Sequence, residues 1–260
     1  MVTTRSQVSK KERGSTGNPL AALEIVTVAK EHKRHNSIRI NTKIDVNRPV
    51  NLPQPPDLPF QLQPALYGLI QERIYTSLYA LVVQAILWNQ TYGLTARPVL
   101  FRILTTYPTP LSLSRAHLKE LSAMLQPIGL QNTRAVRLIA LAKAWVAAPP
   151  CKERRYRKLH YPLRGCGTNV KPGEILGLND DRGGWEIAHF PGMGPYALDS
   201  FRIFYRDRLR GVHSADGEEP EWKKVVPKDK DLKAYLKWKW AEDGWNWNEA
   251  TGVRMRIEAV

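Results

Sequence analysis

From about residue 60 onward, hydrophobic positions recur at the three- and four-residue spacing that is typical of amphipathic helices. The sequence over 77–88 is apolar on nearly every side, which predicts a buried helix, and a shorter helix is predicted over 66–75. The loops NQTYG (89–93) and QPIGL (126–130) interrupt this pattern. Strand-like alternation is nearly absent, so the hydrophobic pattern predicts an all-α fold.

Further helices are predicted after these loops. Ser114 is a suitable N-cap for the helix that contains SRAHLKELSAML, and Asn132 or Thr133 is expected to open the next one. Pro227 marks the expected start of a last helix. The remaining predicted helices have the sequences LTARPVLFRILTTY (94–107), RAVRLIALAKAWVA (134–147), GWEIAHF (184–190) and PYALDSFRIFYRDRL (195–209).

Composition divides the chain into three parts. Residues 1–57 are polar, basic and rich in proline, which predicts a disordered arm. The helical pattern fills 58–250, and Gly-, Pro- and Arg-rich insertions interrupt it near 149–184 and 211–220. Residues 251–260 are expected to form a C-terminal tail.

The charge balance points to a polyanionic partner. Thirty-nine Lys and Arg face 24 Asp and Glu, which gives a net charge of +15 and a pI of about 9.9. Basic residues outnumber acidic ones ten to four within 1–50 and six to one within 151–165. Basic surfaces attract phosphates, so nucleic acid is the expected partner, although a soluble basic protein without such a partner has the same composition.

Cysteine, histidine and apolar content exclude several kinds of site. Cys151 and Cys166 form no CxxC pair, which excludes a zinc site or an iron–sulfur cluster built from four cysteines. The six histidines show no metal-ligand spacing, so no metal or other cofactor is expected. The apolar run 78–88 is too short to span a bilayer, and the N-terminal sequence has no apolar signal core. We therefore expect a soluble intracellular protein with no membrane partner.

The stretch FPGMGPYALDSFRIF (190–204) places two glycines directly before a predicted helix. Glycine allows the backbone to approach a partner closely, and a helix N-terminus attracts anions through its unpaired N–H groups. Together with the preceding segment this predicts a helix–hairpin–helix that holds a DNA phosphate. Taken alone, the bare pattern more often marks an ordinary turn between two helices.

Five blocks that recur in one order give this stretch a family context. Over roughly residues 60–245 the chain resembles the helix–hairpin–helix (HhH-GPD) DNA glycosylase superfamily, and within it the mismatch thymine glycosylases that carry a methyl-CpG-binding domain. The 1–57 arm shows no such domain. The blocks are LIQER, WNQTYG, QPIGLQNTRA, GMGPYALDSFRIF and VVPKDKDL.

The resemblance implies a two-lobed helical fold that flips a thymine or uracil out of a G·T or G·U mispair and excises it. Loss of the base leaves an oxocarbenium-like sugar, which a carboxylate stabilises while it orients water. The family pattern V-x-P-x-D assigns this role to Asp229, at a helix start that favours negative charge. Asp199, Asp207 and Asp231 are the other acidic residues near the hairpin, and Asp199 is expected to pack or hydrogen-bond instead.

The base pocket is likewise assigned from the resemblance. Tyr196 occupies the position where bifunctional members carry a Schiff-base lysine, which implies a monofunctional enzyme that leaves an abasic site. Gln71 matches a glutamine that contacts the flipped pyrimidine, and Tyr196 is expected to stack on it.

The DNA contacts follow from the need to fill the hole that base flipping leaves in the duplex. Leu130 matches the family's wedge leucine, and Gln90 stands where the relatives carry an intercalating arginine. Asp231 stands where they carry a lysine, so the specificity is not expected to be identical. The remaining predicted DNA-binding residues are Thr91, Gly192, Met193, Gly194, Lys228 and Lys230.

The expected partner is double-stranded DNA with a mispaired pyrimidine, bound by a monomer in the nucleus. Three alternatives stay open. The chain could excise another damaged base, it could be a non-catalytic DNA-binding protein on the same scaffold, or its basic 149–184 loop could bind RNA.

Overall fold

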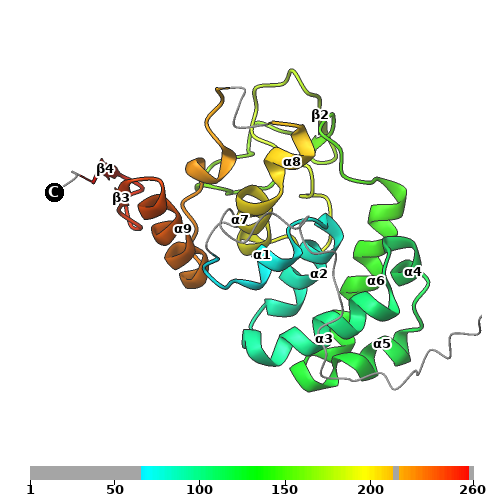
Figure 1. Ribbon diagram of the computed structural model, residues 1–260. Helices are drawn as coiled ribbons and strands as arrows, with labels where there is room; N and C mark the ends of the chain where they lie inside the picture. Colours follow the sequence, from blue (N-terminus) through cyan, green and yellow to red (C-terminus); the bar gives the residue numbers. More distant parts are fainter. Residues whose placement is uncertain (1–65, 213–216, 258–260) are drawn as a thin grey trace, which may run out of the picture. The chain divides into compact units, whose positions relative to one another are not determined.

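The computed structural model describes residues 66–212 and 217–257, so the predicted 1–57 arm and part of the 211–220 insertion lie outside it. Most regular structure in the described part is helical, which confirms the predicted all-α class (Figure 1). The helices and 3₁₀ turns are α1 (Ile70–Ile74), α2 (Leu78–Trp88), α3 (Gly93–Thr106), α4 (Pro110–Ser114), α5 (Leu118–Leu125), η2 (Gln126–Ile128), α6 (Gln131–Ala147), α7 (Pro195–Phe204), α8 (Arg206–Arg210), η4 (Glu221–Lys224) and α9 (Lys230–Glu242).

Helix α2 is the buried helix that the apolar run predicts. Its N-cap Ser77 accepts a hydrogen bond from the Ala80 N–H, and nearly all of its residues are buried. It packs against α1, α3, α6 and α7. Because α2 contacts helices from both halves of the sequence, it organises the main hydrophobic core.

Helix α6 packs against both α4 and α5 (Figure 1). Thr109 caps α4 by accepting from the Ser112 N–H, and Pro110 occupies the first turn. The predicted N-cap Ser114 is wrong, because it ends α4 while α5 begins after His117. The start of α6 also differs from the prediction, since Leu130 in a left-handed conformation precedes Gln131.

The segment GWEIAHF does not form the predicted helix. It makes successive turns, in which the Ala188 N–H donates to the Trp185 carbonyl and the Phe190 N–H to that of Ile187. The helix predicted over 195–209 is divided at Tyr205 into α7 and α8. The glycine hairpin is therefore preceded by turns and followed by a regular helix.

Two hydrophobic clusters lie on either side of α7. The main core combines α2 with buried residues of α3, α5, α6 and α7. The second joins Ile203 to buried residues of α9 and the C-terminal hairpin, among them Trp240 and Trp247. Tyr196 and Phe204 contact both clusters, which places Tyr196 where the two cores meet.

Two short antiparallel hairpins complete the described part. In the 149–184 insertion, β1 (Arg155–Tyr156) pairs with β2 (Ile175–Leu176). After α9, β3 (Trp245–Trp247) pairs with β4 (Arg254–Arg256), so the segment expected to be a tail contains a strand.

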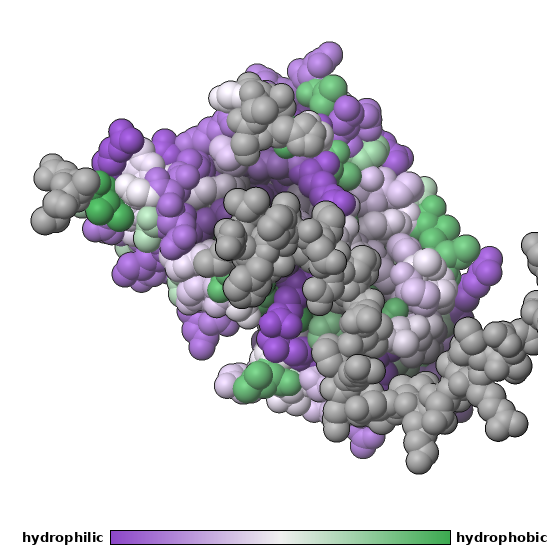
Figure 2. All heavy atoms as spheres, viewed as in Figure 1, coloured by the Kyte–Doolittle hydropathy of each residue, from purple (hydrophilic) through white to green (hydrophobic). Residues whose placement is uncertain are grey.

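Figure 2 shows a face on which hydrophilic residues predominate and hydrophobic ones form small separate groups. Within the described ranges, every helix is too short or too polar to cross a bilayer.

Candidate active site

The glycine hairpin is shaped by close packing at its first glycine. Gly192 has a φ of +89°, and a Cβ there would lie 2.7 Å from Cδ of Arg137. The Met193 and Gly194 N–H groups donate to the carbonyls of Phe190 (3.4 Å) and Gly192 (3.0 Å). Gly194 is the N-cap of α7, whose first turn has no side-chain cap. The first-turn N–H groups of α7 are therefore free of capping side chains among the described residues.

Met193 does not present its side chain to a partner, although it is one of the predicted DNA-binding residues. The side chain is buried in the main core. Any contact of this residue with DNA is thus limited to its backbone.

Tyr196, in the first turn of α7, contacts two buried glutamine side chains. Its hydroxyl accepts hydrogen bonds from Nε2 of Gln71 (3.0 Å) and from Nε2 of Gln84 (2.7 Å). Both glutamines are buried, and Oε1 of Gln84 has no hydrogen-bond partner in the described part of the chain. Burial raises the pKa of Tyr196 to about 12, and the negative charges of Asp229 and Asp231 act in the same direction.

Asp229 is the N-cap of α9. Its Oδ1 accepts hydrogen bonds from the N–H groups of Asp231 and Leu232, each at 3.0 Å. The residue is half-buried, whereas its neighbours Lys228 and Lys230 are exposed. These two bonds orient the carboxylate at the positive end of the helix dipole.

Asp199 lies inside α7, and its carboxylate is engaged. Its Oδ1 accepts a 2.6 Å hydrogen bond from the Tyr161 hydroxyl, and both side chains are buried. Burial raises the pKa of Asp199 to about 6, and the charge of Asp229 also raises it. This arrangement agrees with the hydrogen-bonding role expected for Asp199.

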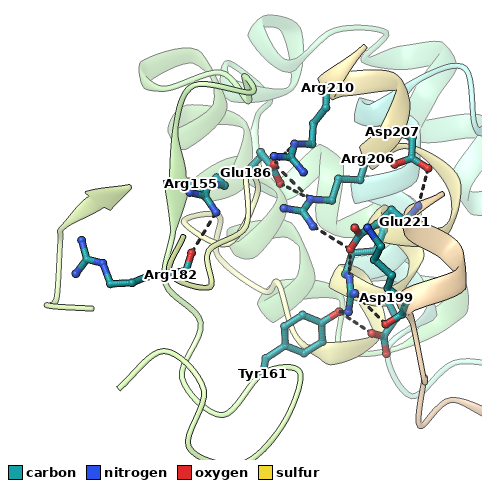
Figure 3. Close-up of polar contacts among 11 residues, drawn as sticks. Arg155, Tyr161, Arg182, Glu186, Asp199, Arg206, Asp207, Arg210 and Glu221 are labelled. Carbon is teal, nitrogen blue, oxygen red and sulfur yellow. Dashed lines mark hydrogen bonds and ion pairs between the residues drawn. The ribbon is translucent and has the colours of Figure 1, made fainter. Parts of the chain in front are cut away.

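A buried ion network holds the segment that leads to Asp229 (Figure 3). Arg206 bridges Glu186 (3.1 Å) and Glu221 (2.9 Å), and the Glu221 N–H donates to Asp207. Arg202 donates through Nε to Glu221 at 2.5 Å and through Nη2 to the Lys224 carbonyl at 3.1 Å. Since Glu221 and Lys224 belong to η4, the network ties η4 to α7 and α8. Asp207 thus has a structural contact as well.

The two loops with predicted inserting residues share another buried arginine. Arg134 donates to the carbonyls of Ile128 (2.7 Å) and Gly129 (3.2 Å) in one loop. In the other loop it donates to the Asn89 carbonyl (2.7 Å) and to the Thr91 hydroxyl. Arg134 therefore fixes the spacing of the two loops.

The two residues predicted to insert into DNA are exposed on these loops. Leu130 (φ +50°) is 57% exposed, and Gln90 (φ +57°) is exposed as well. Positive φ values are uncommon for residues other than glycine and occur where the surrounding structure imposes them. The bonds of Arg134 supply that constraint for both loops.

In the structure, Gln71 and Tyr196 are joined by a hydrogen bond, and the charge of Asp229 acts on Tyr196. The other predicted residues, Leu130, Gln90 and Thr91, lie on the two loops that Arg134 connects. Sequence reasoning did not identify Gln84, Arg134 or Tyr161. Gln84 carried a signal, because it is the one amide within the apolar run 78–88. Arg134 and Tyr161 carried none, since their partners are distant in sequence or are backbone carbonyls.

Among residues 66–212 and 217–257, no three His, Cys, Asp or Glu side chains are gathered as metal ligands would be. The two cysteines are free thiols.

Comparison with known proteins finds similarity to a DNA glycosylase. No protein-family model matches the chain. Over 165 residues the chain is 27% identical to a thymine-DNA glycosylase of Aeropyrum pernix, and the match covers 59% of this chain and 67% of the relative. This distant similarity supports a DNA glycosylase role for the chain.

Proposed function

We propose that the chain is a monofunctional DNA glycosylase that excises thymine or uracil from G·T and G·U mispairs. The observation that carries this proposal is the pairing of the Gln71 amide with the Tyr196 hydroxyl, beside the charge of Asp229. An amide and a hydroxyl match the donors and acceptors on a pyrimidine edge. The similarity to a thymine-DNA glycosylase supports the same substrate class.

The proposed reaction is hydrolysis of the bond between base and sugar. The bond's electron pair leaves with the base, and the deoxyribose acquires oxocarbenium character that the Asp229 carboxylate stabilises. Water then adds to C1′ and gives up a proton, for which Asp229 is the acceptor. The N-cap bonds to Oδ1 keep the carboxylate in one orientation, and its Oδ2 has no hydrogen-bond partner among the described residues.

The assignment as a monofunctional glycosylase, without lyase activity, rests on Tyr196. A lyase step needs an amine that forms a Schiff base with the sugar, and a phenol cannot supply it. The raised pKa of Tyr196 keeps the phenol neutral at physiological pH, which suits hydrogen bonding to a neutral base.

DNA is proposed to lie across the α7 N-terminus and the two loops that Arg134 braces. The first-turn N–H groups of α7 suit a phosphate. The exposed Leu130 and Gln90 side chains are placed to occupy the space that the flipped base vacates. Lys228 and Lys230 add positive charge beside Asp229.

The test is excision from G·T and G·U duplexes, followed by alkali to cleave abasic sites. Asp229→Asn should lower the single-turnover rate by roughly 10²–10³-fold, the usual loss for one electrostatic stabiliser. Asparagine is also a good N-cap, so the fold should be kept. Glu242→Gln is the control, because it removes an exposed carboxylate from the far end of the same helix, α9.

Three outcomes would contradict the proposal. Equal rates for Asp229→Asn and the wild type would exclude Asp229 as the catalytic carboxylate. Tight duplex binding without abasic product from either mispair would select a non-catalytic DNA-binding protein or a glycosylase for another base. Covalent trapping of the wild type on DNA by borohydride would contradict the monofunctional assignment.

A further inference from the structure

Residues 159–165, here called the tip loop, form a closed loop in the 149–184 insertion. The His160 N–H donates to the Cys166 carbonyl at 2.9 Å, and the Cys166 N–H donates to that of Leu163 at 3.1 Å. The Gly165 N–H donates to Nδ1 of His160 at 3.2 Å. Gly167 closes the base of the loop, where a Cβ would lie 2.7 Å from the Lys158 carbonyl oxygen. The tip loop therefore has a defined conformation of its own.

Tyr161 anchors the tip loop to α7. Its hydroxyl donates to Asp199 (Figure 3). Its ring meets the edge of Trp185 at a centroid distance of 5.1 Å, and the Arg202 guanidinium lies 5.9 Å from the centre of the Tyr161 ring. The side chain is 96% buried by these contacts, since only 4% remains exposed. Buried aromatic anchors of this kind fix a loop to the body of a protein.

The anchor lies beside the segment that carries Asp229. The charges of both Lys228 and Asp229 act on the Asp199 carboxyl group to which Tyr161 is bonded. Asp199 also follows Tyr196 by three residues in α7, one helical turn further along. The tip loop is thus attached to the middle of α7, at a carboxyl group that lies within reach of the charges of Lys228 and Asp229.

The end of the tip loop exposes an apolar residue and a basic residue. Leu163 is 71% exposed, and Arg164 beside it is exposed as well. Residues 154–173 contain no Asp or Glu. Neither Lys158 nor Arg164 forms an ion pair within the described part of the chain.

The other arginines of the insertion are used internally. Arg155 donates to the carbonyl oxygens of Gly177, Asp180 and Arg182, and Arg157 donates to that of Val170. Arg182 pairs with Asp180 and Glu174. The insertion thus uses some cations to hold its own fold, while Arg164 is exposed and Lys158 is partly exposed.

We propose that the tip loop and the adjoining Lys158 form a duplex-binding element, in which Lys158 and Arg164 contact phosphates and Leu163 contacts the sugar–base surface beside the flipped nucleotide. The inference rests on the proposed function for the identity of the partner. An exposed leucine next to an unpaired arginine, on a loop of fixed shape, fits the alternation of apolar and anionic surface along DNA. Attachment beside Asp229 favours the duplex under repair over a separate RNA ligand.

The test measures equilibrium binding of the full chain to a G·T duplex over a series of salt concentrations. Lys158→Ala/Arg164→Ala should weaken binding and lower the slope of log affinity against log salt by about two, since each lost phosphate contact removes roughly 0.9. Leu163→Ala should weaken binding without a change of slope. Arg115→Ala/Lys119→Ala is the matched control, because it removes two exposed cations near the start of α5.

The outcomes separate this inference from the proposed function. Excision by the wild type with unchanged binding by both tip-loop variants would overturn the inference and leave the function standing. If the wild type binds the duplex but does not excise the base, and the tip-loop variants bind more weakly, the inference would be supported and the proposed function rejected. An equal loss in the control, or a loss of RNA affinity alone, would overturn the inference.

Discussion

The Tyr196 hydroxyl is the shared acceptor of two buried amides, Gln71 and Gln84. Tyr196→Phe leaves both donors without a partner, so we expect the free energy of unfolding to fall by roughly 1–3 kcal/mol. Gln84→Met removes one donor together with an Oε1 that already lacks a partner in the described part, so its loss should stay under about 1 kcal/mol. Urea unfolding of both variants measures the difference.

The comparison between these variants is informative because both changes conserve volume. A greater loss for Gln84→Met than for Tyr196→Phe would show that the glutamine stabilises the site through a contact other than the phenol. Equal denaturant slopes in the two variants serve as the control for a common unfolded state.

Asp199 gives the molecule a specific pH dependence. Its carboxyl group has a pKa of about 6 in the folded chain, against an ordinary value of 3.8, because it is buried. Between these values the folded chain retains a proton that the unfolded chain has lost, so this group's contribution to stability falls as pH rises from about 4 to 6. The total effect is on the order of 2–3 kcal/mol.

Asp199→Asn should remove this dependence, while asparagine Oδ1 still accepts from Tyr161. We expect the variant to gain stability relative to the wild type as pH rises from 4 to 7, with little further change above 7. Thermal unfolding of the pair across this range checks the expectation. A difference that does not vary with pH would place the titration in other acidic groups such as Asp207, whose pKa is also raised by burial.

At the scale of elements, the spacing of the loops around Gln90 and Leu130 depends on one side chain. Arg134→Met leaves the carbonyls of Asn89 and Ile128 without their donor, so we expect a loss of roughly 1–3 kcal/mol. Amide hydrogen exchange should accelerate in both loops together, because the brace between them is removed.

Arg134→Lys and Arg102→Met are the controls for this prediction. Lysine keeps the charge but has a single nitrogen, so it cannot span both loops and should behave like methionine in hydrogen exchange. Arg102 is exposed on α3, and its replacement should leave both loops unchanged. Faster exchange in one loop alone would show that the loops are held independently.

Local sequence signals predicted the elements whose pattern is unambiguous. The apolar run of α2 and the breaks at 89–93 and 126–130 needed only periodicity and turn residues. GWEIAHF failed because its apolar positions are buried by tertiary contacts, such as those of Trp185 with Tyr161 and Arg202, and not by a helix face. The N-cap Ser114 failed because the preceding Thr109 and Pro110 form a better start.

The candidate site was predictable only in part, for a related reason. Asp229 follows a local motif, and its capping bonds are made within three residues. Gln84 lies 112 residues from Tyr196, Tyr161 lies 38 from Asp199, and Arg134 lies 43 to 45 residues from its partners in the 89–93 loop. Contacts at such separations arise from the packing of whole elements, which a single sequence does not encode in a readable pattern.

At the scale of the whole molecule, we expect the positive charge to affect how fast and how tightly the protein binds DNA, and to have little effect on the rate of excision. Residues 1–50 carry ten Lys or Arg and four Asp or Glu. Deletion of residues 1–57 should therefore weaken binding to any duplex at low salt and reduce the salt slope, because fewer counterions are released. The single-turnover excision rate at saturating protein should stay within about twofold, since the residues around Tyr196 and Asp229 are untouched. A matched G·C duplex is the reference. If the arm acts only through its charge, its deletion must weaken binding to matched and mispaired DNA by the same factor. A loss confined to the mispaired duplex would show that the arm takes part in recognition of the lesion.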